Sequence, residues 1–148
     1  MRMVLLLAGL VLAGLGLAAC APVEVAPVPA APPPGHIELH QDARIPGDID
    51  AAFRAEIAAR YVGDIGLEAT SGDLTANGFI CRELGEYPKV QPGGVLTVCE
   101  LPKPHGLCSD MWTVDLRLKR VTRQISFHRV AAEGRFARTC VSGASPDG

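Results

Sequence analysis

Five cysteines limit what this chain of 148 residues can become more than any other feature. Cys20 stands alone, at the junction of an apolar run and a proline-rich run. The other four lie in the second half of the chain, at Cys81, Cys99, Cys108 and Cys140. Cysteines in an exported domain pair as disulfides, so four of them suit two bonds and the fifth needs a different role.

Residues 1–19 are typical of an export signal. Arg2 gives the amino-terminal end a single positive charge, and residues 4–17 are uncharged and apolar. As a helix this apolar run extends about 21 Å, whereas a bilayer core of about 30 Å needs roughly 20 residues. We therefore expect a segment that is cleaved rather than kept as a transmembrane helix.

The end of this segment, Leu17-Ala18-Ala19-Cys20, resembles the bacterial lipobox. The resemblance implies cleavage before Cys20, diacylglycerol on its thiol and an acyl chain such as palmitate on its amine. Two or three acyl chains anchor a protein stably where one is marginal. By resemblance to sorting in enterobacteria, Ala21 in place of an aspartate favours the outer membrane. The alternative is an ordinary secretory signal that happens to end in Ala-Ala-Cys.

A proline-rich stalk follows the lipidated cysteine, and together they span residues 20–43. Residues 21–35 hold six of the twelve prolines of the chain. Such a segment favours extended polyproline II, which rises about 3.1 Å per residue. The stalk is expected to hold a single domain, residues 44–141, up to roughly 45 Å from the anchor. Residues 142–148 are expected to form a disordered tail.

Two helices are predicted at the start of the domain. Over residues 48–63 one apolar stripe repeats every four positions, with Asp48 as the cap and Gly63 after the end. The stripe consists of Ile49, Phe53, Ile57 and Tyr61. A second, shorter helix begins at Thr70 or Ser71 and ends before Gly78.

Strands dominate the rest of the domain. Short β-rich runs separated by turn formers predict strands over 78–84, 95–101, 111–120, 124–130 and 135–141. The clearest is 111–120, where Trp112, Val114, Leu116 and Leu118 alternate with polar residues. The predicted fold is α+β, with one or two N-terminal helices packed on a three- to five-stranded antiparallel sheet and two disulfides.

The order of these features resembles a known family. A lipobox, a stalk, a helix, a short helix ending in "ANGFIC" and a meander with "WTVDLRL" resemble small outer-membrane lipoproteins of the SmpA/OmlA (BamE-like) type. The resemblance covers residues 48–130 and implies two helices on a three-stranded antiparallel sheet. The "G-M-t" helix junction and "W-x-Y" strand signature of that family are missing here. Its role in β-barrel assembly is therefore not carried over, and no functional residue is transferred.

The sequence leaves three ways to pair the four cysteines. We favour Cys99 with Cys108, closing the segment "ELPKPHGL", and Cys81 with Cys140, tying the first strand to the chain end. Each bond stabilises a small domain by roughly 3 kcal/mol or somewhat more.

The segment "HIELH" has the only spacing that suits a metal ion. On an extended strand His36, Glu38 and His40 share one face, and imidazoles with a carboxylate suit Zn or Cu. The alternative is a solvated segment whose Ile37 and Leu39 dock on the sheet.

Charge is distributed unevenly along the chain. From 38 to 86 acidic residues exceed basic ones by six, and from 110 to 138 basic residues exceed acidic ones by four. Five basic residues cluster on the predicted hairpin, at Arg117, Lys119, Arg120, Arg123 and Arg129. They suit either an ordinary solvated face or a docking surface for an acidic protein loop or an anionic envelope polymer. Nucleic acid is not expected, because an exported lipoprotein rarely meets it and aromatic stacking partners are missing.

Catalysis is not expected. A hydrolase would have to use Ser109, Asp110, Ser126 and His128, yet no G-x-S-x-G turn presents a serine. No cofactor is expected either. We expect a non-catalytic binding or structural module on the periplasmic side of the outer membrane, anchored through Cys20. The alternative is an inhibitor or a metal-binding sensor that acts through residues 100–107, expected to be an exposed loop, or through the "HIELH" segment.

Overall fold

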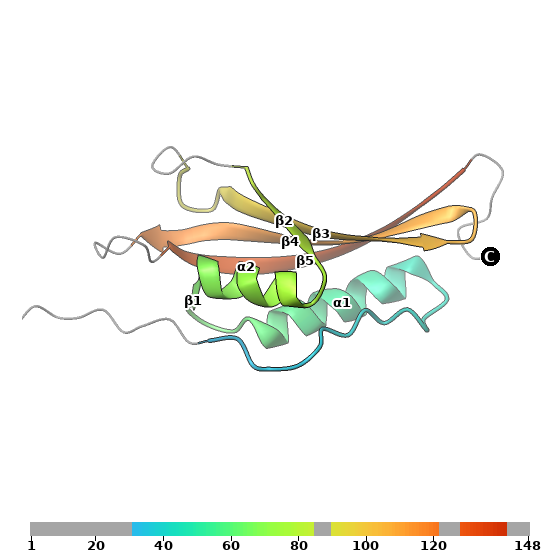
Figure 1. The fold of residues 1–148 in the computed structure, drawn as a ribbon, viewed down its shortest axis with the longest axis horizontal. Helices are drawn as coiled ribbons and strands as arrows, with labels where there is room; N and C mark the ends of the chain where they lie inside the picture. The colour runs from blue at the N-terminus through green and yellow to red at the C-terminus, as the bar shows by residue number, and fades with distance from the viewer. Residues whose placement is uncertain (1–30, 85–89, 122–127, 142–148) are drawn as a thin grey trace, which may run out of the picture.

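The computed structural model describes residues 31–84, 90–121 and 128–141. In these ranges α1 and α2 lie on one side of a curved five-stranded sheet (Figure 1). The strand order is β1-β5-β4-β3-β2, and all neighbours are antiparallel. The predicted α+β class is confirmed. The elements are α1 (Pro46–Arg60), β1 (Ile65–Gly66), α2 (Leu67–Ala76), β2 (Ile80–Glu83), β3 (Val95–His105), β4 (Cys108–Val121) and β5 (His128–Cys140).

The first helix begins slightly earlier than predicted. Pro46 occupies its first turn, where the fixed φ of proline suits the helix and its missing N–H costs nothing. Ile45, rather than Asp48, is therefore the N-cap. Gly63, with φ +83°, follows the end of the helix as predicted. The apolar stripe is also confirmed, because all four of its residues are buried, namely Ile49, Phe53, Ile57 and Tyr61.

The second helix also starts before its predicted cap. Thr70 lies inside α2, where its hydroxyl donates a hydrogen bond to the Gly66 carbonyl at 2.8 Å. The predicted end at Gly78 is confirmed. Gly78 has φ +90°, and the N–H of Phe79 reaches back to the Leu74 carbonyl at 3.0 Å. This is a Schellman ending, which favours glycine because the position needs a left-handed backbone.

The core lies between the helices and one face of the sheet. The alternating apolar residues of β4 are all buried, as the pattern predicted, namely Trp112, Val114, Leu116 and Leu118. On β5 the ring of Phe136 packs at 4.9 Å from the ring of Trp112. Phe53 of α1 stacks at 6.3 Å on Phe79, which follows α2. The apolar residues of both helices therefore join the sheet in one core cluster.

The two last predicted strands, 124–130 and 135–141, are one strand in the structure. β5 runs without a break through Gly134, while residues 122–127 lie outside the described ranges. A Cβ atom at Gly134 would lie 2.8 Å from Cγ1 of Ile57 and 3.2 Å from Cε1 of Phe53. This glycine therefore permits the close approach of α1 to β5, and the prediction of two separate strands on either side of it was wrong.

The segment 100–107 was predicted to be an exposed loop, but most of it is strand. β3 continues to His105, which pairs with Cys108 across a two-residue turn of Gly106 and Leu107. Gly106 has φ +58°, a backbone conformation that suits this kind of turn. The two prolines of "ELPKPHGL" lie inside β3, and the turn itself falls on Gly106 and Leu107.

Both disulfides join neighbouring strands, and the predicted connectivity is wrong. Cys81 bonds to Cys99 with an S–S distance of 2.05 Å, and Cys108 bonds to Cys140 at 2.02 Å. In each pair the two residues lie directly opposite one another in the sheet. Cys99 instead faces Val114, six positions along β4 from Cys108. At about 3.3 Å per residue this leaves roughly 20 Å between Cys99 and Cys108, too far for a bond.

The chain joins the domain before the predicted boundary at residue 44. The N–H of Ile37 donates to Oδ1 of Asn77 at 2.8 Å, and the side chain of Ile37 is buried. Further along, the carbonyl of Leu39 accepts the indole N–H of Trp112 at 3.1 Å. The docking of Ile37 and Leu39 that the sequence suggested is therefore present.

An ion pair joins the ends of the two helices. The guanidinium of Arg60 donates to both carboxylate oxygens of Asp73 at 2.8 Å, and the Tyr61 hydroxyl donates at 2.6 Å. Arg60 also donates to the carbonyl of Gly35, where the chain enters the domain. Burial alone raises the pKa of Asp73, but the hydrogen bonds from Arg60 and Tyr61 outweigh it and hold that pKa below its usual value.

Replacing Gly134 with alanine is expected to destabilise the domain by about 1–3 kcal/mol, because the new methyl group overlaps Ile57 and Phe53. Gly72 is the matched control. It lies exposed inside α2 with open space around it, so Gly72→Ala should stabilise by about 1 kcal/mol through helix propensity. Urea unfolding of both variants measures whether each substitution lowers or raises the free energy of unfolding. A neutral Gly134→Ala would show that α1 does not pack on β5 at this distance.

The Asp73 ion pair should make stability depend on pH. Because the pKa of Asp73 is lower in the folded state than in the unfolded chain, its contribution is fully present above about pH 4–5 and is lost as the pH falls. Asp73→Asn should therefore cost about 1–3 kcal/mol at pH 7, with the difference from the parent shrinking toward pH 2. Exposed Asp42 provides the control, and Asp42→Asn should show neither effect. A pH-independent loss in Asp73→Asn would contradict the assigned ionisation.

Candidate functional site

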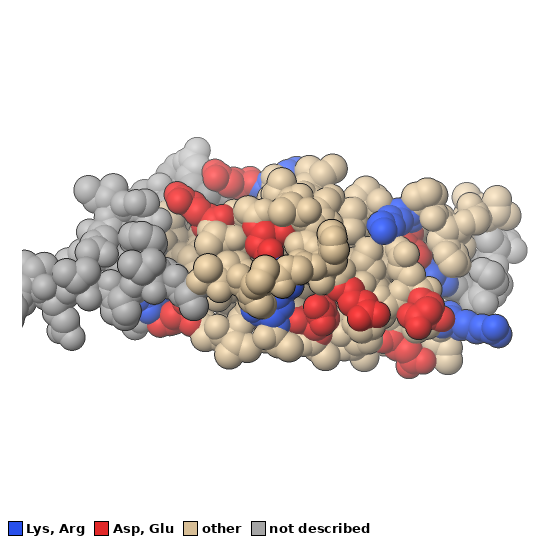
Figure 2. Space-filling view, turned by 60° about the horizontal axis from the view of Figure 1, so that its bottom comes forward, with Lys and Arg blue, Asp and Glu red and all other residues tan. Residues whose placement is uncertain are grey.

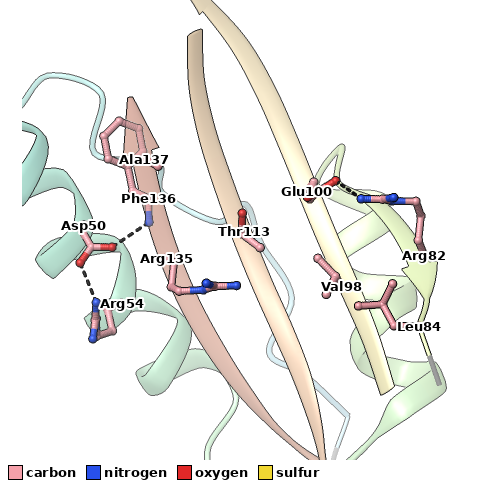
Figure 3. Close-up of a pocket in the computed structure, with 10 residues that line it drawn as sticks. All are labelled: Asp50, Arg54, Arg82, Leu84, Val98, Glu100, Thr113, Arg135, Phe136 and Ala137. Carbon is pink, nitrogen blue, oxygen red and sulfur yellow. Dashed lines mark hydrogen bonds and ion pairs between the residues drawn. The ribbon is translucent and has the colours of Figure 1, made fainter. Parts of the chain in front are cut away.

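The face of the sheet away from the helices carries an open groove of about 530 Å³. Its lining comes from β2, β3, β4 and β5, and the first turns of α1 close one side (Figure 3). The lining residues are Asp50, Arg54, Arg82, Leu84, Val98, Glu100, Thr113, Arg135, Phe136 and Ala137. The groove thus crosses four strands rather than following one.

Small and apolar side chains form the floor of the groove. Strand alternation places Thr113 on the face opposite Trp112, and the sheet register sets Thr113 between Glu100 on β3 and Arg135 on β5. Val98 and Ala137 lie on the same face (Figure 3).

Paired charges line both sides of the groove. On the β2 side Arg82 donates to Glu100 at 2.6 Å. On the α1 side Asp50 accepts from Arg54 at 2.7 Å and from the backbone N–H of Phe136 at 2.7 Å (Figure 3). Burial raises the pKa of Asp50, but these two hydrogen bonds outweigh it and the pKa lies below its usual value. The carboxylate of Asp50 therefore stays ionised and fixes α1 to the edge of β5.

A third pair continues the row of charges along the same face. Arg135 donates to both oxygens of Asp115 at 2.9 Å, and Asp115 is only 4% exposed. Arg117 lies 3.5 Å from the same carboxylate and donates to Glu133 at 2.7 Å. Cations and anions therefore alternate across this face, and a partner would meet local dipoles rather than one sign of charge.

The described residues lining the groove include no histidine, cysteine or serine. No side chain there pairs a nucleophile with a general base. The available groups are guanidinium donors, carboxylate acceptors, one hydroxyl and apolar surface, which suit hydrogen bonding to a bound chain.

Two of the three described side chains of the predicted basic cluster are paired with carboxylates. Arg129 is buried and ion-paired with Asp64, Arg117 is held by the two carboxylates given above, and Lys119 donates to the Gly63 carbonyl at 3.1 Å. The side chain of Arg120 and all of Arg123 lie outside the described residues. The described part of the hairpin therefore presents less free positive charge than the sequence suggested.

The "HIELH" residues do not converge. His36 and Glu38 are exposed, whereas His40 is half-buried with φ +51°, and its Nδ1 lies 4.0 Å from Oε1 of Glu38. The described ranges hold no group of three or more His, Cys, Asp or Glu side chains suited to a metal ion. Buried Ile37 and the contact of Leu39 with Trp112 set the path of this segment.

The hydrolase residues are also spread apart. Asp110 is buried and ion-paired with Arg138 at 2.6 Å, and His105 lies 3.8 Å from Asp110. Ser109 neighbours Asp110 on β4 but faces the other side of the sheet. His128 opens β5, at the far end of that strand from Arg138, and Ser126 lies outside the described residues.

Acidic side chains mark the opposite surface. Figure 2 shows acidic side chains along the helix side of the molecule. Asp48 and Glu68 lie in the first turns of α1 and α2, and both are exposed, as is Asp42 before α1. These three acidic residues thus lie away from the groove, whereas Asp50 from the same stretch of sequence lines it.

The sequence analysis missed the groove, although a usable signal exists. The signal is the alternation along β4, which places Thr113, Asp115 and Arg117 on the face opposite Trp112. Of these three, only Arg117 was weighed as part of a binding surface, within the basic cluster. The other lining residues come from separate strands, and their neighbours were unknown without the register. Arg82 and Glu100 in particular are 18 residues apart and meet only because β2 pairs with β3.

Two further findings bear on function. Neither α1 nor α2, the helices of the described ranges, has the length and apolar character that a membrane crossing requires. Comparison of the chain with protein families, curated proteins and solved structures finds no match. What the protein does is therefore inferred from its own residues.

Proposed function

We propose that this protein is a lipid-anchored lipoprotein of the bacterial envelope whose domain is a non-catalytic binding module. The mature chain starts at Cys20, which carries acyl chains in the periplasmic face of the outer membrane. The groove on the open sheet face is the binding surface. The observation that carries the proposal is this groove, a preformed surface of about 530 Å³ lined by paired charges and a small, apolar floor.

The cross-links support the proposed compartment. All four cysteines of the domain are bonded in two pairs, Cys81–Cys99 and Cys108–Cys140. Structural disulfides persist in the periplasm and are rare in the reducing cytosol. Cys20 is then the one cysteine free to take a lipid, as the lipobox implies.

The path of the stalk also supports the groove as the binding surface. The chain enters the domain at Gly35, next to Arg60 on the helix side. The described part of the stalk therefore leaves the opposite face of the sheet uncovered. A protein held to a membrane through residues 20–34 can present this face to another envelope component.

The charges of the groove favour a protein segment as the partner. Each guanidinium there already faces a carboxylate, as Arg82 faces Glu100 and Arg54 faces Asp50. An anionic polymer would have to displace these carboxylates, whereas a peptide offers both donors and acceptors. We therefore place an extended polypeptide ahead of lipopolysaccharide or peptidoglycan.

A second candidate uses the β3–β4 turn. Leu107 is 71% exposed at the tip of this hairpin, and Lys103 and His105 precede it. Such a protruding tip suits insertion into a cleft of another protein, as in an inhibitor. Loss of binding in Leu107→Asp with an intact groove would favour this second function.

Anchoring is tested by labelling cells with radioactive palmitate. The parent chain should take up label and sediment with membranes. Cys20→Ser should lose the label and, where the signal is still cleaved, appear in the soluble periplasmic fraction. Cys108→Ser with Cys140→Ser is the control, which should keep the label. Equal labelling of Cys20→Ser would overturn the lipid anchor.

Groove binding is tested by cross-linking in intact cells followed by capture. Ala137→Arg fills the exposed side of the groove and should reduce captured protein partners at least tenfold. Ala58→Arg, exposed on the helix side, is the matched control and should leave capture unchanged. Partners that persist in Ala137→Arg and vanish in Leu107→Asp would move the site to the hairpin tip.

A further inference from the structure

The two edges of the sheet differ in how far other elements cover their backbone groups. Along β5, the short strand β1 pairs with Arg129 and Val130, and Asp50 accepts the N–H of Phe136. α1 lies along the rest of this edge (Figure 1). β1 and the Asp50 carboxylate thus supply hydrogen-bond partners at this edge and α1 covers it, which are common ways to protect a sheet edge.

The opposite edge consists of β2 and the part of β3 that extends beyond it. Leu84 donates its N–H to the Leu96 carbonyl, so this residue pair is hydrogen-bonded. Because antiparallel pairing alternates, Ile80 and Arg82 also bond to β3, while the backbone groups of Cys81 and Glu83 point outward. By the same alternation the outward positions of the extended β3 are Pro102 and Pro104. Proline has no N–H, so among the described residues of this edge the outward donors are those of β2.

The side chains beside these donors are unusually apolar for a sheet edge. Ile80 is 64% exposed and Leu84 is 60% exposed, and both lie on the open face. Arg82 stands midway between them and is ion-paired with its own Glu100 at 2.6 Å. An exposed apolar pair flanking outward backbone donors is a template for another strand.

We propose that β2 pairs antiparallel with β2 of a second copy of this chain, about a two-fold axis at Arg82. In this register Ile80 lies opposite Leu84 of the second copy, and the same contact repeats on the other side of the axis. Cys81 and Glu83 of the second copy exchange both backbone hydrogen bonds. The five strands of each copy then continue as one sheet.

The spacing of the side chains favours a second copy over an unrelated strand. A two-fold axis at Arg82 places the residue two positions before Arg82 opposite the residue two positions after it in the second copy. These residues are Ile80 and Leu84, and both side chains are large and apolar. The two Arg82 side chains meet at the axis, but Glu100 already neutralises each of them. The two exposed apolar residues of this edge, Ile80 in β2 and Leu84 directly after it, therefore each find an apolar partner without a new unpaired charge.

The contact is small, so pairing in dilute solution is expected to be weak. Here the inference rests on the proposed lipid anchor. Copies confined to one membrane surface meet at a far higher effective concentration than free molecules do. Pairing should therefore be readily detected on membranes and need concentrated protein otherwise.

The test is a cysteine at the axis. Residues facing each other at a non-hydrogen-bonded antiparallel position have Cα atoms about 4.5 Å apart, within disulfide range. Arg82→Cys in the full chain should thus form a disulfide-linked dimer under mild oxidation in membranes. Leu107→Cys, which is even more exposed but distant from β2, is the control and should not. Peptide mapping verifies the 82–82 link and the native Cys81–Cys99 bond.

A second variant removes the risk that a new cysteine disturbs the fold. Ile80→Lys with Leu84→Lys should weaken pairing at least tenfold, measured by energy transfer between labelled copies in vesicles. Val62→Lys with Val141→Lys, equally exposed elsewhere, should not. Equal energy transfer in both double variants would overturn the proposal. So would cross-linking of Arg82→Cys no faster than Leu107→Cys, or its capture of a different protein.

Repeating the cross-linking with Cys20→Ser separates this inference from the anchor. A dimer in concentrated Cys20→Ser supports the pairing even if palmitate labelling fails. Absence of the dimer in both forms, with labelling intact, overturns the pairing and leaves the anchor standing.

Discussion

Unpaired backbone groups at the edges of an open sheet are the constraint on which the arrangement of this domain depends. β1 and Asp50 cover one edge, and α1 can lie there because Gly134 has no side chain. Pro102 and Pro104 remove the outward donors from the long end of β3. The elements that look irregular in the sequence, a two-residue strand, a buried glycine and prolines within a strand, all address the same problem.

Charged side chains are arranged by a similar constraint. A buried charge is stable only when it is paired, and basic residues of β4 and β5 accordingly form ion pairs with carboxylates. Arg138 meets Asp110, and Arg135 meets Asp115 from the other face. Net charge along the sequence therefore says little about the surface of this domain. A segment with an excess of four positive charges yields a face on which cations and anions alternate.

Periodicity predicted what depends on local sequence, and failed where distant residues meet. The stripe on α1, the alternation on β4 and the end of α2 at Gly78 follow from spacing within one element. The disulfides and the groove depend on strand register. The sequence of one strand does not say which residues of another strand lie opposite it. Gly134 shows the difference, because a glycine in a strand marks either a break or a close contact. Only the presence of Ile57 opposite it decides between them.

The Cys81–Cys99 bond acquires a further meaning when the exposed edge is considered. β2 has four residues and, within the described ranges, no strand on its outer side, so hydrogen bonds alone would hold it loosely. The disulfide fixes the middle of this strand to β3 and so fixes where the backbone groups of Cys81 and Glu83 point. A strand already held in its bound geometry loses less conformational entropy on pairing. In the proposed pairing, the covalent bond that stabilises the domain therefore also holds β2 in the geometry that the second copy would meet.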